Sequence, residues 1–353
     1  MITEKSLLQA HYENFPQMAI GDAVKFLYQR FMGPGHLVPE AAKGVARLRE
    51  EWDAVDADDT LPLSTPLGNG LCRLHLRPCK GLGLSPNTVA RLFLLTAQQF
   101  TPDPARLEQA LNQVCSLPFP PGQAEEYVRQ YREQGCPMVS HSEHFRACYS
   151  PAYRIVSEYY VSMIPLLAAI DRSTADFPQL RVAIDGPCAS GKSTLGHALQ
   201  EIYSCELIHM DDFFLRPEQR THERLAQPGG NVDYERFSQE VLSPLLAHRP
   251  ISYRPWSCST QSFAPPVCIP PAPLTVVEGC YSLRDDLRHA YHLRVWAYAD
   301  WNSRSRRLLG RGGEECLARF RQLWIPLEDR YFDHMQVQQC CQLRLDLSDK
   351  TAL

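Results

Sequence analysis

Residues 183–194, AIDGPCASGKST, constrain this chain more than any other stretch, because they contain the pattern G-x-x-x-x-G-K-S. The two glycines let the backbone curl tightly, so that successive N–H groups point at one anion. The lysine brings a positive charge to the β- and γ-phosphates of a nucleotide, and the serine hydroxyl is placed to hold Mg²⁺. We therefore predict a phosphate-binding loop that holds a nucleotide through Gly186, Pro187, Ala189, Ser190, Gly191, Lys192, Ser193 and Thr194.

The flanking residues support this prediction. Leu180, Val182 and Ile184 form a short apolar run that is typical of a buried strand. Apolar residues then recur at helical spacing from Leu195 to Ile202, which indicates a helix whose N-terminus faces the phosphates. Strand, glycine-rich loop and helix form the context in which the pattern binds phosphate. The alternative, a chance turn rich in glycine and serine, explains neither the complete pattern nor its flanks.

The composition is that of a globular protein large enough for two domains, with 353 residues, 44% of them hydrophobic and 22% charged. The net charge is −4 and neither half is basic, so we expect no nucleic acid partner. The longest apolar run, 161–170, is too short to span a bilayer, so we expect no membrane partner. The 13 cysteines form no C-x-x-C pair and no signal peptide is visible, which predicts reduced thiols and a cytoplasmic protein.

Residues 1–172 are expected to form a mainly helical domain. Apolar positions at helical spacing in 24–31, 89–96 and 107–114 predict helices. Stretches rich in glycine and proline, such as 64–70, predict the loops between them. A short polar boundary leads into a second domain, residues 178–353.

The second domain is expected to be an α/β fold, a doubly wound parallel sheet. After the loop, apolar runs at 205–210, 274–277 and 293–298 alternate with helical patterns, as in a parallel sheet with helices on both faces. Residues 244–273 contain eight prolines, which preclude a long helix. There we expect an ordered excursion or a short edge hairpin, either holding a second substrate or forming a plain surface loop.

Acidic residues follow two of these predicted strands. Asp211 and Asp212 come after the run 205–210, and Glu278 ends the run 274–277. The carboxyl ends of such strands face the ligand crevice. A carboxylate there can accept the proton of an attacking hydroxyl or help to hold Mg²⁺. The alternatives are that the aspartates cap a helix and that Glu278 is an ordinary strand-terminal residue.

A basic stretch, 303–313, ends in two glycines. Arginines on a mobile segment can close over the transferring phosphoryl group, offset its charge and exclude water. A solvated helix face is the usual meaning of clustered charge, and this stretch alone does not separate the two interpretations.

Residues 180 to about 345 resemble the uridine kinase and phosphoribulokinase family of P-loop kinases. Its members phosphorylate a hydroxyl of a small metabolite, so the resemblance implies ATP and Mg²⁺ as cofactors. It also implies that Asp211 is the general base near the metal and that Arg307 and Arg311 are lid arginines. The resemblance rests on residues 186–194, Met210–Phe214, Asn231–Tyr234, Val277–Gly279, Arg306–Arg311 and Trp324–Glu328.

The resemblance also suggests an acceptor site. Asp233 matches an acid that grips sugar hydroxyls in the nucleoside kinases, whereas Asp212 stands where those kinases have serine or a similar residue. Tyr253 and Arg254 lie about where their base-contacting residues lie. The candidate catalytic residues are thus Lys192, Asp211, Arg307 and Arg311, the substrate residues Asp212, Phe214, Asp233, Tyr253 and Arg254, and the metal ligands Ser193, Asp211 and Glu278.

Together these patterns predict an ATP- and Mg²⁺-dependent phosphotransferase whose acceptor is a uridine- or cytidine-like nucleoside. Two alternatives stay open. The acceptor could be a sugar, a hydroxy acid or a pantothenate-like metabolite, or the chain could be a nucleotide-binding switch or ATPase without a small acceptor. The chain lacks the N-K-x-D motif of guanine-specific switches. The sequence leaves open whether the chain forms a homo-oligomer.

Polar residues of a catalytic kind also recur in the first half, around 33–36, 69–75 and 140–146. If they converge, they would form an anion site or, less readily, a metal site. Lone histidines are more often structural. This domain could be a second enzyme, a regulatory or substrate-binding module, or a scaffold for dimerisation. The candidate residues are His36, Arg73, His75, His141, His144 and Arg154.

Overall fold

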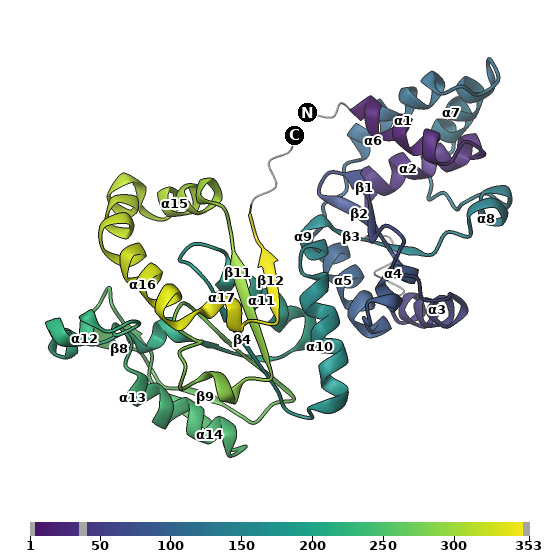
Figure 1. Cartoon of the computed structure of the whole chain (residues 1–353). Coiled ribbons are helices and arrows are strands. Elements are labelled where there is room, and N and C mark those ends of the chain that lie inside the picture. Colours follow the sequence, from purple (N-terminus) through teal and green to yellow (C-terminus); the bar gives the residue numbers. More distant parts are fainter. Residues whose placement is uncertain (1–3, 35–40, 349–353) are drawn as a thin grey trace. The chain divides into compact units, whose positions relative to one another are not determined.

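The computed structural model describes residues 4–34 and 41–348 (Figure 1). The chain forms two compact units that meet between Ala168 and Ala169, within helix α10 (Ile164–Asp176). Among the described residues, no helix combines the length and the apolar character that crossing a bilayer requires. All 13 cysteines lie in the described residues and none is in a disulfide.

The second unit is built on a five-stranded parallel sheet. Its strands are β4 (Leu180–Asp185), β5 (Glu206–His209), β10 (Leu274–Glu278), β11 (Leu293–Tyr298) and β12 (Leu343–Asp346), in the order β12-β11-β4-β10-β5. Every adjacent pair is parallel. The strand that carries the phosphate loop is therefore central. A parallel sheet with this strand order and flanking helices is an α/β fold, so the predicted α/β architecture is confirmed.

Burial explains why these runs become central strands. β10 is buried along its whole length and β4 at every position except Arg181, as expected for a sheet covered on both faces. α11 packs against β5 and β10, and α17 against β11. The helical segments of this unit are α11 (Lys192–Tyr203), η3 (Met210–Phe213), η4 (Pro217–Gln219), α12 (His222–Ala226), α13 (Tyr234–Phe237), η5 (Ser238–Leu242), α14 (Ser243–Leu246), η6 (Arg288–Ala290), α15 (Trp301–Arg319), η7 (Phe320–Trp324), α16 (Ile325–Met335) and α17 (Val337–Cys340).

The proline-rich region forms two small antiparallel pairs. β6 (Ile251–Tyr253) pairs with β9 (Val267–Ile269), and within them β7 (Trp256–Ser257) pairs with β8 (Ser262–Phe263). The expected ordered hairpin is thus present. Inward-facing residues such as Ile251, Tyr253 and Ile269 join the core of this unit, so the region is anchored by apolar packing.

The first unit is mainly helical but also contains a small sheet. β2 (Leu71–His75) pairs antiparallel with β1 (Ser64–Gly68) and β3 (Tyr153–Ser157). The interpretation of 64–70 as a loop was wrong for Ser64–Gly68, which forms β1, and only Asn69 and Gly70 form the turn. β2 was not expected, because it is buried on both faces and lacks alternation, and its partner β3 is distant in sequence. The helices are α1 (Glu4–Asn14), α2 (Ile20–Met32), α3 (Ala41–Ala54), α4 (Leu76–Gly81), α5 (Pro86–Gln99), α6 (Pro104–Ala110), η2 (Leu111–Ser116), α7 (Gln123–Glu133), α8 (Glu143–Tyr149) and α9 (Glu158–Val161).

The close packing of the phosphate loop on the sheet gives a test of the fold. A Cβ added at Gly186 would lie 2.0 Å from the carbonyl oxygen of Ala297 on β11, and Gly186 has φ +150°. We expect Gly186→Ala to lower the free energy of unfolding by more than about 2 kcal/mol, measured by thermal and urea denaturation. Gly310→Ala is the matched control, because Gly310 lies in α15 with open space around it. The control should be neutral or stabilising by up to about 1 kcal/mol, and equal melting of both variants would contradict this packing.

Candidate active site

The loop between β4 and α11 has the backbone of an anion cradle. Gly186, Ala189 and Gly191 have φ values of +150°, +56° and +104°, and Gly191 is the N-cap of α11. The buried Ser190 Oγ has no hydrogen-bond partner. A buried hydroxyl without a partner, beside a helix N-terminus and a curled backbone, fits a loop that binds phosphate oxygens.

Asp185, the last residue of β4, fixes the start of the loop. Its carboxylate accepts hydrogen bonds from the N–H groups of Gly186 (2.7 Å), Leu283 (2.9 Å) and Tyr281 (3.3 Å), and from the hydroxyl of Tyr331 (2.8 Å). Burial raises the pKa of Asp185 to about 6, although these donors and Lys192 oppose the rise. Asp185 is therefore a structural anchor.

Lys192 lies across the inside of the loop. Its Nζ donates to the carbonyl oxygens of Gly186 (2.8 Å) and Pro187 (2.9 Å), and the residue is buried. These two bonds hold the ammonium group at the loop, where an incoming phosphate could exchange with the carbonyls. Ser193 and Thr194, by contrast, are exposed at the start of α11.

Side chains from α15 and α16 support the loop from outside. Glu328 accepts a hydrogen bond from the N–H of Cys188 (2.9 Å), and Arg304 donates to the Cys188 carbonyl (2.8 Å). Arg307 donates to the carbonyls of Ala189 (3.1 Å) and Ser190 (2.8 Å). Neither Arg304 nor Glu328 was among the predicted site residues, although Glu328 belongs to a stretch that carries the resemblance.

The two predicted lid arginines differ in their surroundings. Arg307 is half-buried and holds the loop backbone, whereas Arg311 is exposed one turn further along α15. The helix is interrupted just beyond, at Gly312 and Gly313. The structure thus places Arg307 at the loop, and Arg311 on a segment bordered by a break. The contact of either arginine with a phosphoryl group stays a prediction.

The predicted acids lie at the ends of adjacent strands. Glu278 ends β10, and β5 leads into η3 with Asp211. The buried Glu278 accepts a hydrogen bond from His209 Nδ1 (2.5 Å), which raises the pKa of His209 despite its burial. Asp211 keeps solvent contact, yet the protein around it is dense enough to raise its pKa, and the charge of Lys192 opposes this rise.

These oxygen donors fit Mg²⁺ bound together with a nucleotide. Among the described residues, no three His, Cys, Asp or Glu side chains form a metal cluster. Mg²⁺ on a nucleotide does not need one, because it takes one or two protein oxygens and completes its shell with water and phosphate. Ser193, Asp211 and Glu278 remain the predicted ligands. On binding the metal, Glu278 would either keep its hydrogen bond to His209 or replace that bond by the metal contact.

The structure brings two of the predicted acceptor residues together. The Tyr253 hydroxyl donates to Asp212 Oδ2 (3.1 Å). Asp233 caps α13 by accepting from the N–H of Arg236 (3.1 Å), and it also accepts from Gln219 Nε2 (2.7 Å). Arg254 donates to the carbonyls of Phe263 and Ala264 and so holds the β7–β8 hairpin. Asp233 and Arg254 thus have structural partners, and their substrate contacts stay predictions.

Phe214 lines a small pocket of about 110 Å³ that includes residues absent from the sequence prediction. The Asn231 side chain is buried beside the Tyr281 hydroxyl, and its Nδ2 has no hydrogen bond of ordinary geometry. Because a buried amide donor is costly to leave unpaired, Asn231 is a candidate contact for an acceptor. The Asn-x-Asp segment was a signal for it, but the sequence prediction chose Asp233. The pocket is lined by Phe214, Arg220, Leu225, Asn231, Leu323, Trp324 and Leu327.

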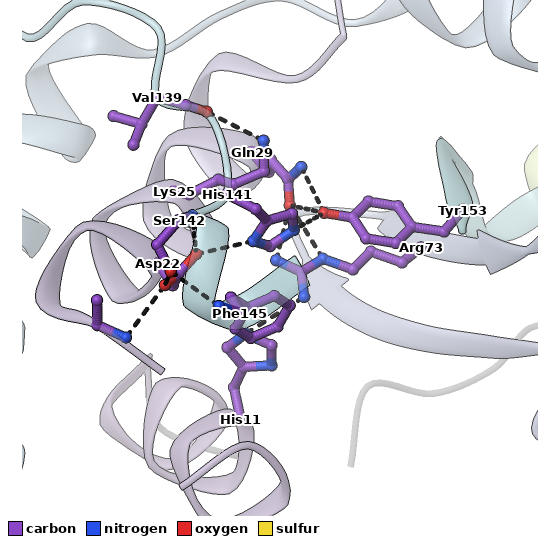
Figure 2. A network of polar contacts seen from close by, with 11 residues as sticks. His11, Asp22, Lys25, Gln29, Arg73, Val139, His141, Ser142, Phe145 and Tyr153 are labelled. Atoms are coloured by element: carbon purple, nitrogen blue, oxygen red, sulfur yellow. Dashed lines mark hydrogen bonds and ion pairs between the residues drawn. The ribbon is translucent and has the colours of Figure 1, made fainter. Parts of the chain in front are cut away.

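In the first unit, three of the predicted polar residues converge. Arg73 and His141 lie around Tyr153 (Figure 2). The ring of His75 also packs edge-on against that of Tyr153, with ring centres 6.2 Å apart. His144 is exposed beside Cys148. Arg154 pairs with Glu51 (2.6 Å) and donates to the backbone carbonyl of Tyr153 (2.9 Å), so it touches the cluster only at this backbone oxygen. His36 lies outside the described residues.

A chain of hydrogen bonds runs through this cluster from a cation to an anion (Figure 2). Arg73 donates from Nε and Nη2 to Gln29 Oε1 (2.9 and 2.7 Å), and Gln29 Nε2 donates to the Tyr153 hydroxyl (3.0 Å). That hydroxyl lies 2.6 Å from His141 Nε2, and His141 Nδ1 lies 2.9 Å from Asp22 Oδ1. With an ionised Asp22, the Nδ1–H tautomer of His141 lets every member donate to the next.

The surroundings set the charge of this network. Burial would raise the pKa of Asp22, but hydrogen bonds from His141, Ser142 and Ala19 lower it to about 2. Burial lowers the pKa of His141 and His75 to about 4, and burial followed by the charge of Arg73 lowers that of His11 to about 2. At neutral pH the network therefore holds an ionised aspartate, neutral histidines and the Arg73 cation.

Comparison with known proteins gives matches only among solved structures, because no protein-family model and no curated protein matches the chain. A protein from Bacillus stearothermophilus described as a possible uridine kinase has 18% identity, covers 51% of this chain and 99% of its own length, and has a TM-score of 0.39. D-glycerate 3-kinase from Cryptococcus neoformans has 15% identity, coverages of 48% and 87%, and a TM-score of 0.36. Shikimate kinase from Bacteroides thetaiotaomicron has 14% identity, coverages of 48% and 89%, and a TM-score of 0.25. These small-metabolite kinases thus match about half of the chain.

The buried histidines of the first unit predict its acid sensitivity. His75 and His141 take up protons near pH 6.5 when unfolded but only near pH 4 when folded. The unfolded state thus binds more protons between pH 6.5 and 4. The free energy of unfolding therefore decreases as the pH is lowered through this window, by on the order of 2 kcal/mol per histidine. Urea unfolding at pH 7 and 4.5, followed by pulsed hydrogen exchange in β2 and β3 at one labelling pH, measures the loss.

Single substitutions check which groups cause this dependence. His75→Gln should make the pH dependence shallower by about one proton, whereas replacing the exposed His144 by Gln should leave it unchanged. A urea midpoint of the first unit that stays constant from pH 7 to 4.5 would show that these histidines are not held neutral.

Proposed function

We propose that this protein is an ATP- and Mg²⁺-dependent kinase that transfers the γ-phosphoryl group to a hydroxyl of a small metabolite. The observation that carries the proposal is the combination of two features. One is a complete phosphate loop with Lys192 inside it, and the other is the pair of acids, Asp211 and Glu278, at the ends of the neighbouring strands β5 and β10. A nucleotide-binding switch would need the loop, but not the acid and the pocket that follow β5. This combination therefore favours transfer to an acceptor over simple hydrolysis.

The proposed roles follow from charge and position. The N–H groups of residues 186–191 and the N-terminus of α11 would hold the phosphates, and Mg²⁺ supplies charge neutralisation when bound. Lys192 would exchange its two carbonyl partners for phosphate oxygens and so offset the negative charge that moves during transfer. Asp211 would orient the acceptor hydroxyl and accept its proton. Its raised pKa is a suitable feature, because it makes the carboxylate a better base.

For the acceptor, we propose a uridine- or cytidine-like nucleoside as the first candidate. Asp212 is adjacent in sequence to the proposed base Asp211 and accepts a hydrogen bond from the Tyr253 hydroxyl. The aromatic rings of Phe214 and Trp324 face the same small pocket, with centroids 6.3 Å apart. Aromatic faces combined with the buried Asn231 amide suit a flat polar ring such as a pyrimidine.

One observation favours a second candidate, a hydroxy acid. Arg220 lines the pocket, and in the described residues its side chain donates to the Leu215 carbonyl and to Cys258 Sγ but forms no ion pair. A guanidinium without a carboxylate partner fits an acceptor that itself carries a carboxylate. The two candidates differ in whether the acceptor is neutral or anionic.

The mechanism predicts that single substitutions at Lys192 and Asp211 lower turnover strongly and leave the fold intact. Lys192→Ala should lower kcat by about 10²-fold or more, because transition-state charge loses its nearest cation. Asp211→Asn should lower kcat by about 10²- to 10⁴-fold through loss of the base. Both are measured by ATP-dependent product formation. Asp176→Asn, at an exposed position on α10, is the matched control and should be unaffected. Near-normal turnover by Lys192→Ala with an unchanged melting temperature would refute the mechanism.

A panel of substrates tests which class of acceptor the protein uses. Purified protein is given ATP and Mg²⁺ with nucleosides, sugars, pantothenate and hydroxy acids, and phosphorylated products are identified by mass. Turnover of uridine or cytidine supports the first candidate, and Arg220→Met should then change the KM by less than about 3-fold. Turnover of a hydroxy acid supports the second, and the same variant should then raise the KM by about 10-fold or more. ATP binding without any product would favour the switch or ATPase alternative.

A further inference from the structure

The first unit contains a second, larger pocket that no step of the proposed kinase reaction uses. Its volume is about 350 Å³, enough for a small metabolite. Residues from α1, the strands of the small sheet and α8 line it. Three members of the polar cluster, Arg73, His75 and Tyr153, face it, together with the aromatic residues Phe15, Phe145 and Tyr149. Some of the polar residues that the sequence analysis expected to converge therefore meet at a cavity.

The charged side chains that line this pocket have one sign. Arg73 and Arg77 both line it, and its lining contains no aspartate or glutamate. Among the described residues, neither guanidinium lies within ion-pair distance of a carboxylate. Arg73 is only 2% exposed, and a buried cation without an adjacent anion is costly. The pocket thus has the electrostatics of a site for an anion.

Arg73 retains hydrogen-bonding capacity for such a ligand. Three of its five N–H groups are used in the described structure, by Gln29 Oε1 twice and by His11 Nε2 (3.2 Å). This leaves one N–H on each terminal nitrogen, and two such donors match the two oxygens of a carboxylate or phosphate. We propose that this pocket binds a small metabolite through an oxyanion, a carboxylate or a phosphate, held by Arg73 and Arg77.

The surrounding network prepares Arg73 for this role. Its guanidinium carbon lies 5.4 Å from the ring centre of Phe26 and 4.8 Å from that of Tyr153. Through Gln29, Tyr153 and His141, the cation is connected to Asp22 by the hydrogen-bond chain of Figure 2. A side chain held by rings and hydrogen bonds loses little freedom when it binds, which raises affinity.

The apolar part of the ligand is suggested by the other walls. Phe15, Phe145 and Tyr149 form one aromatic cluster, with ring centres 4.9 to 5.4 Å apart, and Leu61, Pro62 and Pro78 also line the pocket. A compact organic body bearing one oxyanion therefore fits better than an extended polymer or a metal ion. The carboxylate and the phosphate share this chemistry, and the experiment distinguishes them.

The test uses the full-length protein and calorimetric titration with four anions and one neutral compound. The anions are benzoate, 4-hydroxybenzoate, phenyl phosphate and ribose 5-phosphate, and the neutral compound is benzamide. We expect at least one anion to bind 10-fold more tightly than benzamide. A preference for the first two anions identifies a carboxylate ligand, and a preference for the last two a phosphate ester.

Variants locate the binding and separate it from the phosphate loop. Arg73→Lys and Arg77→Met should each weaken the preferred anion by about 10-fold or more without changing ATP affinity. Because Arg73→Lys could fail to fold, Arg77→Met provides the test at a less buried position. Arg47→Met, at an exposed arginine of the same unit, is the matched control and should have no effect. The proposal is overturned if no anion binds better than benzamide, or if the binding is unchanged in Arg77→Met.

Discussion

The second unit depends on how one buried carboxylate fixes the end of its central strand. Asp185 collects three backbone N–H groups and the Tyr331 hydroxyl. The bonds tie β4 to the segment that follows β10 and to α16. Because the phosphate loop starts at the next residue, its position on the sheet is set by this anchor. Burial without these donors would be very costly for a carboxylate, so the anchor and the surrounding backbone must form together.

The loop itself is held by charged side chains on both of its sides. Lys192 donates to carbonyls on the inside, whereas Glu328 and the arginines 304 and 307 bind its backbone from outside. A loop fixed at this many points needs little rearrangement when a nucleotide binds. Such preorganisation is what allows strong electrostatic stabilisation of charge in the transition state. The outer contacts come from α15 and α16, so movement of these helices would displace the loop.

The sequence predicted those features that are local. The phosphate loop follows from the spacing of its glycines, lysine and serine. The positions of Asp211 and Glu278 follow because the carboxyl ends of parallel strands lie at the same edge of a sheet. Features made by distant residues were not predictable in the same way. Glu328 meets Cys188 only in the fold. β2 was missed because a strand buried on both faces has no alternation, and its cluster joins residues from α2, β2, β3 and the start of α8.

The two buried aspartates of this protein show how surroundings decide the state of the same group. Asp185 and Asp22 each accept four hydrogen bonds, yet the pKa of Asp185 is raised to about 6 and that of Asp22 is lowered to about 2. Asp185 lies among many more protein atoms, so desolvation dominates. Asp22 is less crowded and has His141 and a serine hydroxyl as donors. A firmly ionised Asp22 keeps the His141 proton on Nδ1, and this orders the hydrogen-bond chain as far as Arg73. Because a guanidinium has only donors, the N–H groups of Arg73 that Gln29 and His11 do not use remain available to the pocket.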